Sequence, residues 1–312
     1  MKAIVCTEFG PPEVLQVQEI DKPIPKNNEV LIRIFTTTVH RGDTRMRSLD
    51  IPGPAWQRFL ARVMLGIRKP RNPILGMELA GKIETVGDDV SNFKPGDEVF
   101  ASTLWSGFGA YAEYKCMAET GVLAMKPSNL TFEEATVIPS GGITTLGIVK
   151  MANAQVGHKV LVYGASGSVG TFAVQLFKNL GVEITGVCSA ANFDLVKSLG
   201  ADRLIDYTKE DFSQLDDKYD LVFDAVDKFP PDKAKKTLRD GGKYLNVDPA
   251  SDKIKSDEVI PLLQELKKLC EAGKLKAVID RRYPLDQIVE AHRYVDQGHK
   301  KGNVVITVAA NS

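Results

Sequence analysis

The 312-residue sequence predicts an α/β protein that combines a doubly wound parallel sheet with a second, mostly β domain. Three observations predict this fold class. The length suits two domains, because one domain usually takes about 100–200 residues. Short apolar runs alternate with helical segments from about residue 127 onward, which is typical of βαβ units. A glycine-rich turn over 164–170 joins one of these runs directly to a helix.

The first domain is expected over residues 1–126, where strand-like runs are separated by glycine and proline. These runs are KAIVC (2–6), EVLIRIF (29–35), AGKIETVG (80–87), DEVFA (97–101) and GAYAEY (109–114). Residues 261–312 are expected to complete this domain. They end in the apolar run NVVITV (303–308), a lone strand that must pair with a sheet edge.

The second domain is expected over residues 127–260. Its five strand-like runs are KVLVYG (159–164), EITGVC (183–188), RLIDY (203–207), DLVFDAV (220–226) and KYLNV (243–247). Helical patterns separate most of them, at 168–181, 193–200 and 233–242. This alternation predicts a parallel sheet with helical crossovers.

Composition excludes several classes of protein. The 40 basic and 40 acidic side chains cancel, which argues against a nucleic-acid or membrane-surface protein. The four cysteines are widely spaced, so neither a disulfide framework nor a compact zinc site is expected. The first residues have no apolar signal region, and no run approaches the roughly 20 apolar residues of a membrane span. We expect a cytoplasmic protein.

The turn over 164–170 carries the clearest functional signal. It reads Gly164, Ala165, Ser166, Gly167, Ser168, Val169, Gly170. A glycine at 167 allows the backbone to approach a pyrophosphate, and one at 170 allows the helix to pack closely on the strand. The N-terminal end of that helix then attracts the phosphates. The alternative is a doubly wound fold in which the glycines serve only the turn.

The choice of dinucleotide depends on the end of the second strand, where NAD-preferring sheets carry an acid. Ser189 stands there, and Glu183 lies at the start of the strand, where it points the wrong way. No carboxylate would repel a 2′-phosphate, so the sequence favours NADPH.

Four motifs give the chain a family resemblance along nearly its whole length. They are GMELAG (76–81), FKPGDEV (93–99), GAYAEY (109–114) and the turn over 164–170. The sequence resembles the zinc-independent quinone oxidoreductases, the zeta-crystallin-like branch of the medium-chain dehydrogenase/reductase superfamily. The resemblance implies a Rossmann domain and a GroES-like catalytic domain. It also implies NADPH-dependent reduction of quinones or α,β-unsaturated carbonyl compounds, and a homodimer.

The resemblance also assigns site residues by position. Thr144 is expected beneath the nicotinamide and residues 164–170 at the pyrophosphate. The remaining cofactor residues are Ser189, Asn192 and Tyr207 around the adenosine phosphate, Ala225, Val226, Asn246 and Val247 at strand ends, and Gly302 and Asn303 before the last strand.

A metal is not expected. Zinc-dependent relatives carry a cysteine near Asp43 and a histidine where Met77 stands, and methionine is not a zinc ligand. His40, Asp43 and Glu78 still suggest a metal site, but turn and interdomain hydrogen bonds explain them better.

The expected reaction is hydride transfer to a quinone or to the β-carbon of an enone. His40 is the one candidate catalytic residue, because an ordinary pKa near 6.5 would suit a proton donor; a structural histidine is the alternative. Two other functions stay open: a non-enzymatic NADPH-binding sensor or stress-related protein, and an enoyl-thioester reductase. The expected partner is a small quinone or enone, with no nucleic acid and no membrane.

Residues 55–71 form a basic amphipathic segment. Its apolar stripe is Trp56, Phe59, Leu60, Val63, Met64 and Ile67, and its cations are Arg58, Arg62, Arg68, Lys69 and Arg71. We expect this helix to pack on the catalytic domain with one end lining the substrate pocket. A lid and a membrane-surface anchor are the alternatives.

Overall fold

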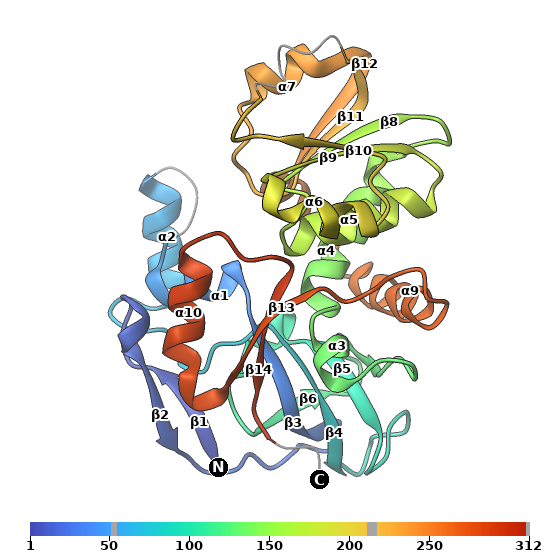
Figure 1. Ribbon diagram of the computed structural model, residues 1–312. Coiled ribbons are helices and arrows are strands. Elements are labelled where there is room, and N and C mark those ends of the chain that lie inside the picture. Colours follow the sequence, from blue (N-terminus) through green and yellow to red (C-terminus); the bar gives the residue numbers. More distant parts are fainter. Residues whose placement is uncertain (51–54, 211–216, 310–312) are drawn as a thin grey trace. The chain divides into compact units, whose positions relative to one another are not determined.

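The computed structural model describes residues 1–50, 55–210 and 217–309, and the chain divides into two compact units. Unit 1 comprises Met1–Ser140 and Ile279–Ser312, and unit 2 comprises Gly141–Val278 (Figure 1). Both chain ends therefore build unit 1, and a continuous middle segment builds unit 2. The predicted α/β class is confirmed.

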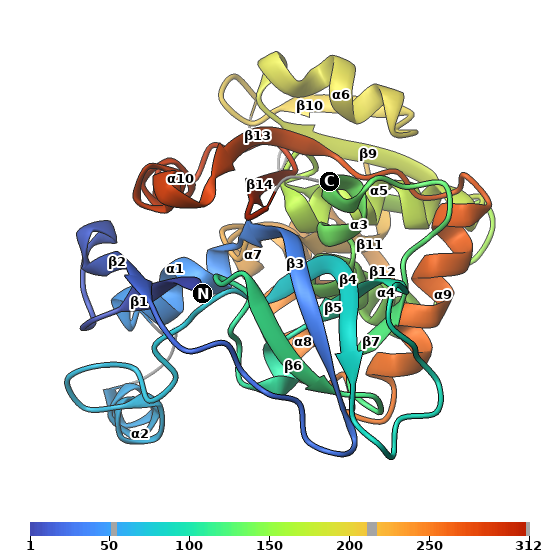
Figure 2. The ribbon, with the colours of Figure 1, turned by 90° about the horizontal axis from the view of Figure 1, so that it is seen from below.

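Unit 1 contains a mixed sheet with a two-stranded sheet beside it. Along the main sheet the described strands are ordered β13 (Ile279–Pro284), β14 (Asn303–Thr307), β3 (Glu29–Val39), β4 (Glu78–Val86), β5 (Glu98–Ser102) and β7 (Leu123–Met125), with β6 (Tyr114–Ala118) also paired to β3. The second sheet pairs β1 (Lys2–Cys6) with β2 (Leu15–Glu19). Figure 2 shows β3, β4 and β6 side by side.

The helices of unit 1 flank these sheets. They are η1 (Pro12–Val14), α1 (Arg41–Ser48), α2 (Ala55–Leu65), η2 (Leu104–Ser106), α3 (Phe132–Thr136), η5 (Leu285–Gln287) and α10 (Ile288–Asp296). The final strand β14 is antiparallel to β3, with Val304 opposite Val39. The C-terminal run thus finds its edge on the first long strand, as the sequence predicts.

Unit 2 contains a parallel sheet in the order β10-β9-β8-β11-β12. Its strands are β8 (Lys159–Tyr163), β9 (Glu183–Cys188), β10 (Arg203–Asp206), β11 (Tyr219–Asp224) and β12 (Leu238–Asn246). The helices are α4 (Pro139–Ala152, whose first two residues belong to unit 1), α5 (Ser168–Asn179), η3 (Ala190–Asn192), α6 (Phe193–Ser198), α7 (Pro231–Thr237), α8 (Val247–Ser251) and α9 (Val259–Glu271). From β8 the strand order runs outward to β9 and β10, and then the chain returns to place β11 on the other side of β8. Ligands of such sheets usually bind at this point of reversal, between β8 and β11.

Each unit has its own apolar core. In unit 1 one cluster includes Ile32, Leu79 and Val99, whose side chains are fully buried. In unit 2 the corresponding cluster includes Leu161 and Val222. No helix in the described ranges combines the length and apolar character needed to cross a membrane.

The unit boundaries differ from the expected 126/127 and 260/261. Residues 127–140 belong to unit 1 because α3 is bonded to β3: Thr36 Oγ1 donates to the Phe132 carbonyl at 3.0 Å. Residues 261–278 belong to unit 2 because α9 packs along α4, where Leu262 lies against Gly147 and Lys150 pairs with Glu265 at 2.5 Å.

Two local predictions are wrong. The strand expected over 109–114 begins only at Tyr114, because Gly107, Phe108 and Gly109 have positive φ angles of 79°, 63° and 102° and form a turn. The helix expected over 233–242 ends at Thr237, and its last residues start β12 instead.

The expected packing of the apolar stripe of 55–71 on the catalytic domain is also wrong, whereas its place at one end of the substrate pocket stays a prediction. The helix exists as α2, but the described side chains of its apolar stripe are exposed. The side chain of Arg58 lies outside the described residues.

Candidate active site

The parallel sheet of unit 2 gathers most of the predicted cofactor residues at the carboxyl ends of its strands. Gly164 follows β8, Ser189 follows β9, Tyr207 follows β10, Ala225 and Val226 follow β11, Asn246 ends β12, and Val247 begins α8. Because all five strands are parallel, these ends share one edge. Sequence reasoning therefore placed these residues together correctly; their contacts with a cofactor remain a proposal.

The glycine turn has a different requirement at each glycine. Gly164 has a φ of +76°, and a Cβ there would meet Val226 at 2.6 Å. A Cβ at Gly170 would lie 2.1 Å from the Gly164 carbonyl oxygen, so α5 approaches β8 as closely as only glycine allows. A Cβ at Gly167 would have the Gly164 carbonyl oxygen as its nearest neighbour, at 3.5 Å, so there is open space over this part of the backbone. Gly167 is also the N-cap of α5 and has no side chain to cap it.

A hydroxyl and amide cluster lies between the ends of β8 and β9. Asn192 Nδ2 donates to Ser166 Oγ at 3.1 Å and to Ser189 Oγ at 3.2 Å. Its Oδ1 is buried and has no hydrogen-bond partner among the described residues. Nearby, Tyr207 is half exposed, and its ring centroid is 6.3 Å from that of Tyr163. The cluster thus presents one unsatisfied acceptor and an accessible aromatic ring.

Asp224 is a positioning residue that the sequence analysis did not single out. Its carboxylate ends β11 and accepts hydrogen bonds from the backbone N–H groups of Val226 at 3.0 Å and Phe229 at 2.8 Å. Burial raises its pKa above the ordinary value. Asp224 therefore shapes the loop that carries Ala225 and Val226. The signal was present in the sequence as an acid at the end of an otherwise apolar run, LVFD (221–224).

Three other predicted residues lie away from those strand ends. Thr144 is half-buried on α4, one turn after Gly141, where a Cβ would meet both Ser168 Oγ and a Phe172 ring carbon at 3.1 Å. The first turns of α4 and α5 are thus close together within unit 2. Gly302 and Asn303 lie in unit 1, at the start of β14, and their expected contact with the nucleotide remains a prediction.

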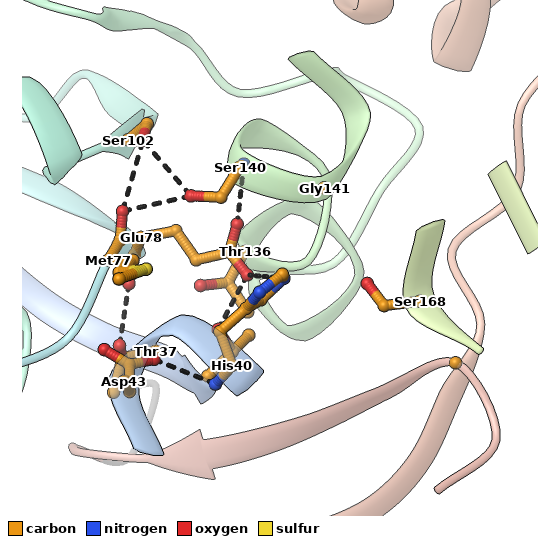
Figure 3. Close-up of polar contacts among 12 residues, drawn as sticks. Thr37, His40, Asp43, Met77, Glu78, Ser102, Thr136, Ser140, Gly141 and Ser168 are labelled. Atoms are coloured by element: carbon orange, nitrogen blue, oxygen red, sulfur yellow. Dashed lines mark hydrogen bonds and ion pairs between the residues drawn. The ribbon is translucent and has the colours of Figure 1, made fainter. Parts of the chain in front are cut away.

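His40 follows β3 in unit 1 and precedes α1 (Figure 3). Its side chain is 16% exposed, and Nε2 lies 4.0 Å from a Glu78 carboxylate oxygen, which is beyond hydrogen-bond range. Nε2 is buried without a partner among the described residues. Burial, and then the charge of Lys300, lower its pKa to about 3. The expected pKa near 6.5 is wrong, and the imidazole is neutral near pH 7.

Two buried carboxyl groups lie near His40. Glu78 accepts hydrogen bonds from Thr38 Oγ1 at 2.6 Å and from the Ser140 backbone N–H at 2.8 Å. Asp43 accepts from the backbone N–H groups of His40 at 2.8 Å and Gly76 at 3.1 Å. Burial is the largest influence on both, and it raises the pKa of each to about 7.

These contacts bear on the metal question. Each carboxyl group uses both of its oxygens to accept hydrogen bonds. Met77 packs its thioether against α1, where a Cβ on Gly42 would lie 2.6 Å from Sδ. Among the described residues no three His, Cys, Asp or Glu side chains group as metal ligands would. The donor set does not fit zinc, which prefers His, Cys or free carboxylate.

Unit 1 holds a second buried polar chain, which sequence reasoning missed. Arg47 Nη1 lies 3.1 Å from His292 Nδ1, and His292 Nε2 lies 3.1 Å from the Tyr111 hydroxyl. Burial lowers the pKa of His292 well below its ordinary value, so the ring is neutral. Since arginine only donates, Nδ1 accepts and Nε2–H donates to Tyr111. Long-range pairs of this kind, 181 and 245 residues apart, leave no local sequence signal.

Comparisons with known proteins agree with this architecture. A family model described as "Alcohol dehydrogenase GroES-like domain" matches residues 26–127, and one described as "Zinc-binding dehydrogenase" matches residues 199–306. The chain is 32% identical to a 2-methylene-furan-3-one reductase of Solanum lycopersicum over 98% of this chain and 79% of that protein. An NADPH-dependent alkenal/one oxidoreductase of Arabidopsis thaliana, named as chloroplastic, is also 32% identical with the same coverage.

Among solved structures, the quinone oxidoreductase from Coxiella burnetii superimposes with a TM-score of 0.86 at 28% identity, covering 99% of both chains. The similarity thus extends over both units. The chain belongs to the medium-chain dehydrogenase/reductase superfamily, among its quinone and alkenal oxidoreductases.

Proposed function

We propose that this protein is an NADPH-dependent reductase of quinones or α,β-unsaturated carbonyl compounds. One observation carries the proposal. In the part of the chain that the structure describes, only two buried side-chain polar atoms lack a partner: His40 Nε2 and Asn192 Oδ1. Buried polar atoms are nearly always paired, so these two mark positions where a bound ligand would complete the hydrogen bonding. Both belong to residues that the sequence assigns to the site.

Unit 2 fits a dinucleotide. The open space at Gly167 admits a pyrophosphate, and the uncapped start of α5 offers backbone N–H groups and a positive dipole end. Ser189, Asn192 and Tyr207 would surround the adenosine end, and Thr144 the nicotinamide end. NADPH, when bound, supplies the hydride.

His40 would hydrogen-bond the substrate that accepts the hydride, rather than supply the proton of the reaction. A neutral imidazole near pH 7 holds its single N–H proton too tightly to act as a proton donor, but with that proton on Nε2 it can donate a hydrogen bond to a carbonyl oxygen. Such a bond stabilises the negative charge that develops on that oxygen during reduction. Quinones and enones are electrophilic already, so positioning and one such bond suffice, and water supplies the proton.

We also propose that the reaction is zinc-independent. The carboxylates of Asp43 and Glu78 are engaged, and Met77 occupies the position of a zinc ligand. Elemental analysis of the purified protein should find well under one zinc ion per chain. Dialysis against a chelator should leave turnover unchanged; a loss that added Zn²⁺ restores would contradict the proposal.

The direct test incubates the protein with NADPH and a panel of quinones, enones and enoyl thioesters while NADPH absorbance is followed. Turnover of quinones or enones is expected. Tight NADPH binding without turnover on any acceptor would favour the sensor function. Activity confined to thioesters would favour the enoyl-thioester reductase.

Two further expectations remain proposals. Location in the cytoplasm is supported by the wide spacing of the four cysteines along the sequence, which offers no disulfide framework, and fractionation of the source cells tests it. A homodimer is supported only by the family resemblance, and sedimentation velocity of the purified protein tests it.

A further inference from the structure

The exposed apolar side of α2 and the basic turn after it form one surface, here called the α2 surface. Its apolar members are Trp56, Phe59, Leu60, Val63, Met64 and Ile67, with exposed fractions between 40% and 70%. Large apolar side chains are usually exposed singly, so six within twelve residues need an explanation. In Figures 1 and 2 α2 stands at the periphery of unit 1.

The helix separates apolar from basic positions. At about 100° per residue, Trp56, Phe59, Leu60, Val63 and Met64 fall within a sector about 140° wide. Arg62 projects outside that sector, and its Nε donates to the Ile67 carbonyl at 3.0 Å. The arrangement is an amphipathic helix whose apolar side none of the described residues covers.

The turn after α2 holds further cations in place. Gly66 ends the helix with a φ of +131°, and the Arg71 N–H donates to the Leu65 carbonyl at 2.8 Å. Arg68 and Lys69 follow, and both are exposed. The sequence contains no acidic residue from 51 to 77, and within the described ranges Arg62, Arg68, Lys69 and Arg71 make no ion pair. The local charge is therefore strongly positive, although the whole chain is neutral.

We propose that the α2 surface docks onto anionic lipid bilayers, with the apolar side chains at the level of the headgroups. A Trp- and Phe-bearing apolar side flanked by cations is the pattern of helices that lie in a membrane interface. Each cation near an anionic surface adds attraction. A second copy of the chain fits less well, because a symmetric contact would bring each cluster of cations against its own copy. This proposal does not depend on the reductase function.

Tryptophan emission gives a direct test. The chain has two tryptophans, so Trp105→Phe leaves Trp56 as the only reporter. The full-length W105F protein is mixed with vesicles of phosphatidylcholine alone or with one-third phosphatidylglycerol. We expect a blue shift and co-sedimentation only with the anionic vesicles, both reversed by 0.5 M salt.

Variants assign the binding to this surface. Phe59→Ser with Met64→Ser, and separately Arg68→Gln with Lys69→Gln, should each weaken vesicle binding about tenfold or more. Lys197→Gln with Lys209→Gln, which removes two exposed cations in unit 2, is the matched control and should bind as the parent does. Unchanged thermal midpoints show that the variants are folded.

Three results would overturn the proposal. Equal binding by the Arg68/Lys69 variant and the parent would remove the charge argument. A concentration-dependent blue shift with doubled mass, without vesicles, would identify a second copy as the occupant. A blue shift caused by a soluble apolar enone alone would identify α2 as part of the substrate pocket.

Discussion

His40 is the residue on which the proposed chemistry depends most. His40→Ala should lower kcat for an enone roughly tenfold to a hundredfold, because one hydrogen bond to the developing oxyanion is lost. KM for NADPH should change little. His299→Ala, which alters an exposed histidine of the same unit, is the control for steady-state kinetics. Unchanged kcat in the His40 variant would make His40 a structural residue.

The pH profile gives a second view of His40. Because the pKa of His40 is lowered to about 3, His40 should not titrate near pH 6.5. The pH dependence of kcat between pH 5.5 and 8 should therefore have the same shape in the parent and in His40→Ala. Measurement of kcat between pH 5.5 and 8 checks this. A step that disappears in the variant would restore the role of proton donor.

Ser189 is the residue proposed to favour NADPH over NADH. Ser189→Asp places a carboxylate beside the expected 2′-phosphate and should raise KM for NADPH roughly tenfold or more through charge repulsion. KM for NADH should change much less. Ser189→Ala, which removes the hydroxyl without adding charge, separates repulsion from loss of a hydrogen bond. Equal effects of Asp on both cofactors would place the phosphate elsewhere.

Glu78 makes stability depend on pH. Its pKa is raised from 4.5 to about 7 by burial, so the folded chain holds a proton that the unfolded chain loses between those values. The free energy of unfolding should therefore fall as pH rises from about 4.5 to 7, and the full contribution is present only below about 4.5. Glu78→Gln should remove up to about 1.4 kcal/mol per pH unit of this decline.

Urea unfolding at pH 4.5, 5.5 and 6.5 measures the change. Glu84→Gln is the matched control, because the hydrogen bond from Lys22 holds the pKa of Glu84 below its usual value. The contribution of Glu84 to the free energy of unfolding is lost only as the pH falls below about 4.5. The slope of that free energy against pH between 4.5 and 6.5 should therefore be the same in Glu84→Gln as in the parent. A Glu78 variant with the parental slope would contradict the assignment.

At the scale of elements, the junction of β8 and α5 holds one glycine required for packing, Gly170, and one proposed to bind the cofactor, Gly167. Gly170→Ala should destabilise the protein by roughly 2–4 kcal/mol, because its Cβ would lie 2.1 Å from a backbone oxygen. Gly167→Ala meets nothing closer than 3.5 Å, so stability should change by less than about 0.5 kcal/mol.

The same pair differs in NADPH binding. The methyl group at 167 would occupy the space over the backbone, so the Gly167→Ala protein should bind NADPH roughly tenfold more weakly. Calorimetric titration and urea unfolding of both variants check the pair. Unchanged affinity in Gly167→Ala would remove the pyrophosphate from this turn.

The elements also show how far sequence reasoning reaches. Alternation of apolar runs and helices predicted the parallel sheet, because period and turn residues are local signals. The strand expected at 109–114 failed because Phe108 adopts a positive φ that its residue type does not announce. The neutral state of His40 and the chain from Arg47 to Tyr111 depend on burial by residues distant in sequence. The exposure of α2 was missed because an apolar stripe looks the same whether or not anything covers it.

For the whole molecule, the order of segments predicts that the folding of unit 1 depends on the C-terminal region and that the folding of unit 2 does not. β14 lies between β13 and β3, so a chain ending at Gly302 lacks a central strand of unit 1. Unit 2 takes no strand from that region. The truncated protein should lose protease resistance in unit 1 but retain a resistant fragment near 141–278. Mass spectrometry after limited proteolysis checks this, with a chain ending at Ala309 as control.

The position of β14 in the sequence also delays the completion of the unit 1 sheet during synthesis. Between Val39 at the end of β3 and Asn303 at the start of β14 the ribosome adds about 260 residues, which takes roughly 15–50 s at usual rates. All of unit 2 leaves the ribosome within that interval and is free to fold first. Meanwhile residues 36–39 of β3, the stretch that pairs with β14, wait with that edge unpaired, because β6 pairs only with residues 29–33 of that strand. An unpaired strand edge is what chaperones protect and what aggregates recruit. The nascent chain is therefore left open to aggregation in an early segment rather than in its newest one.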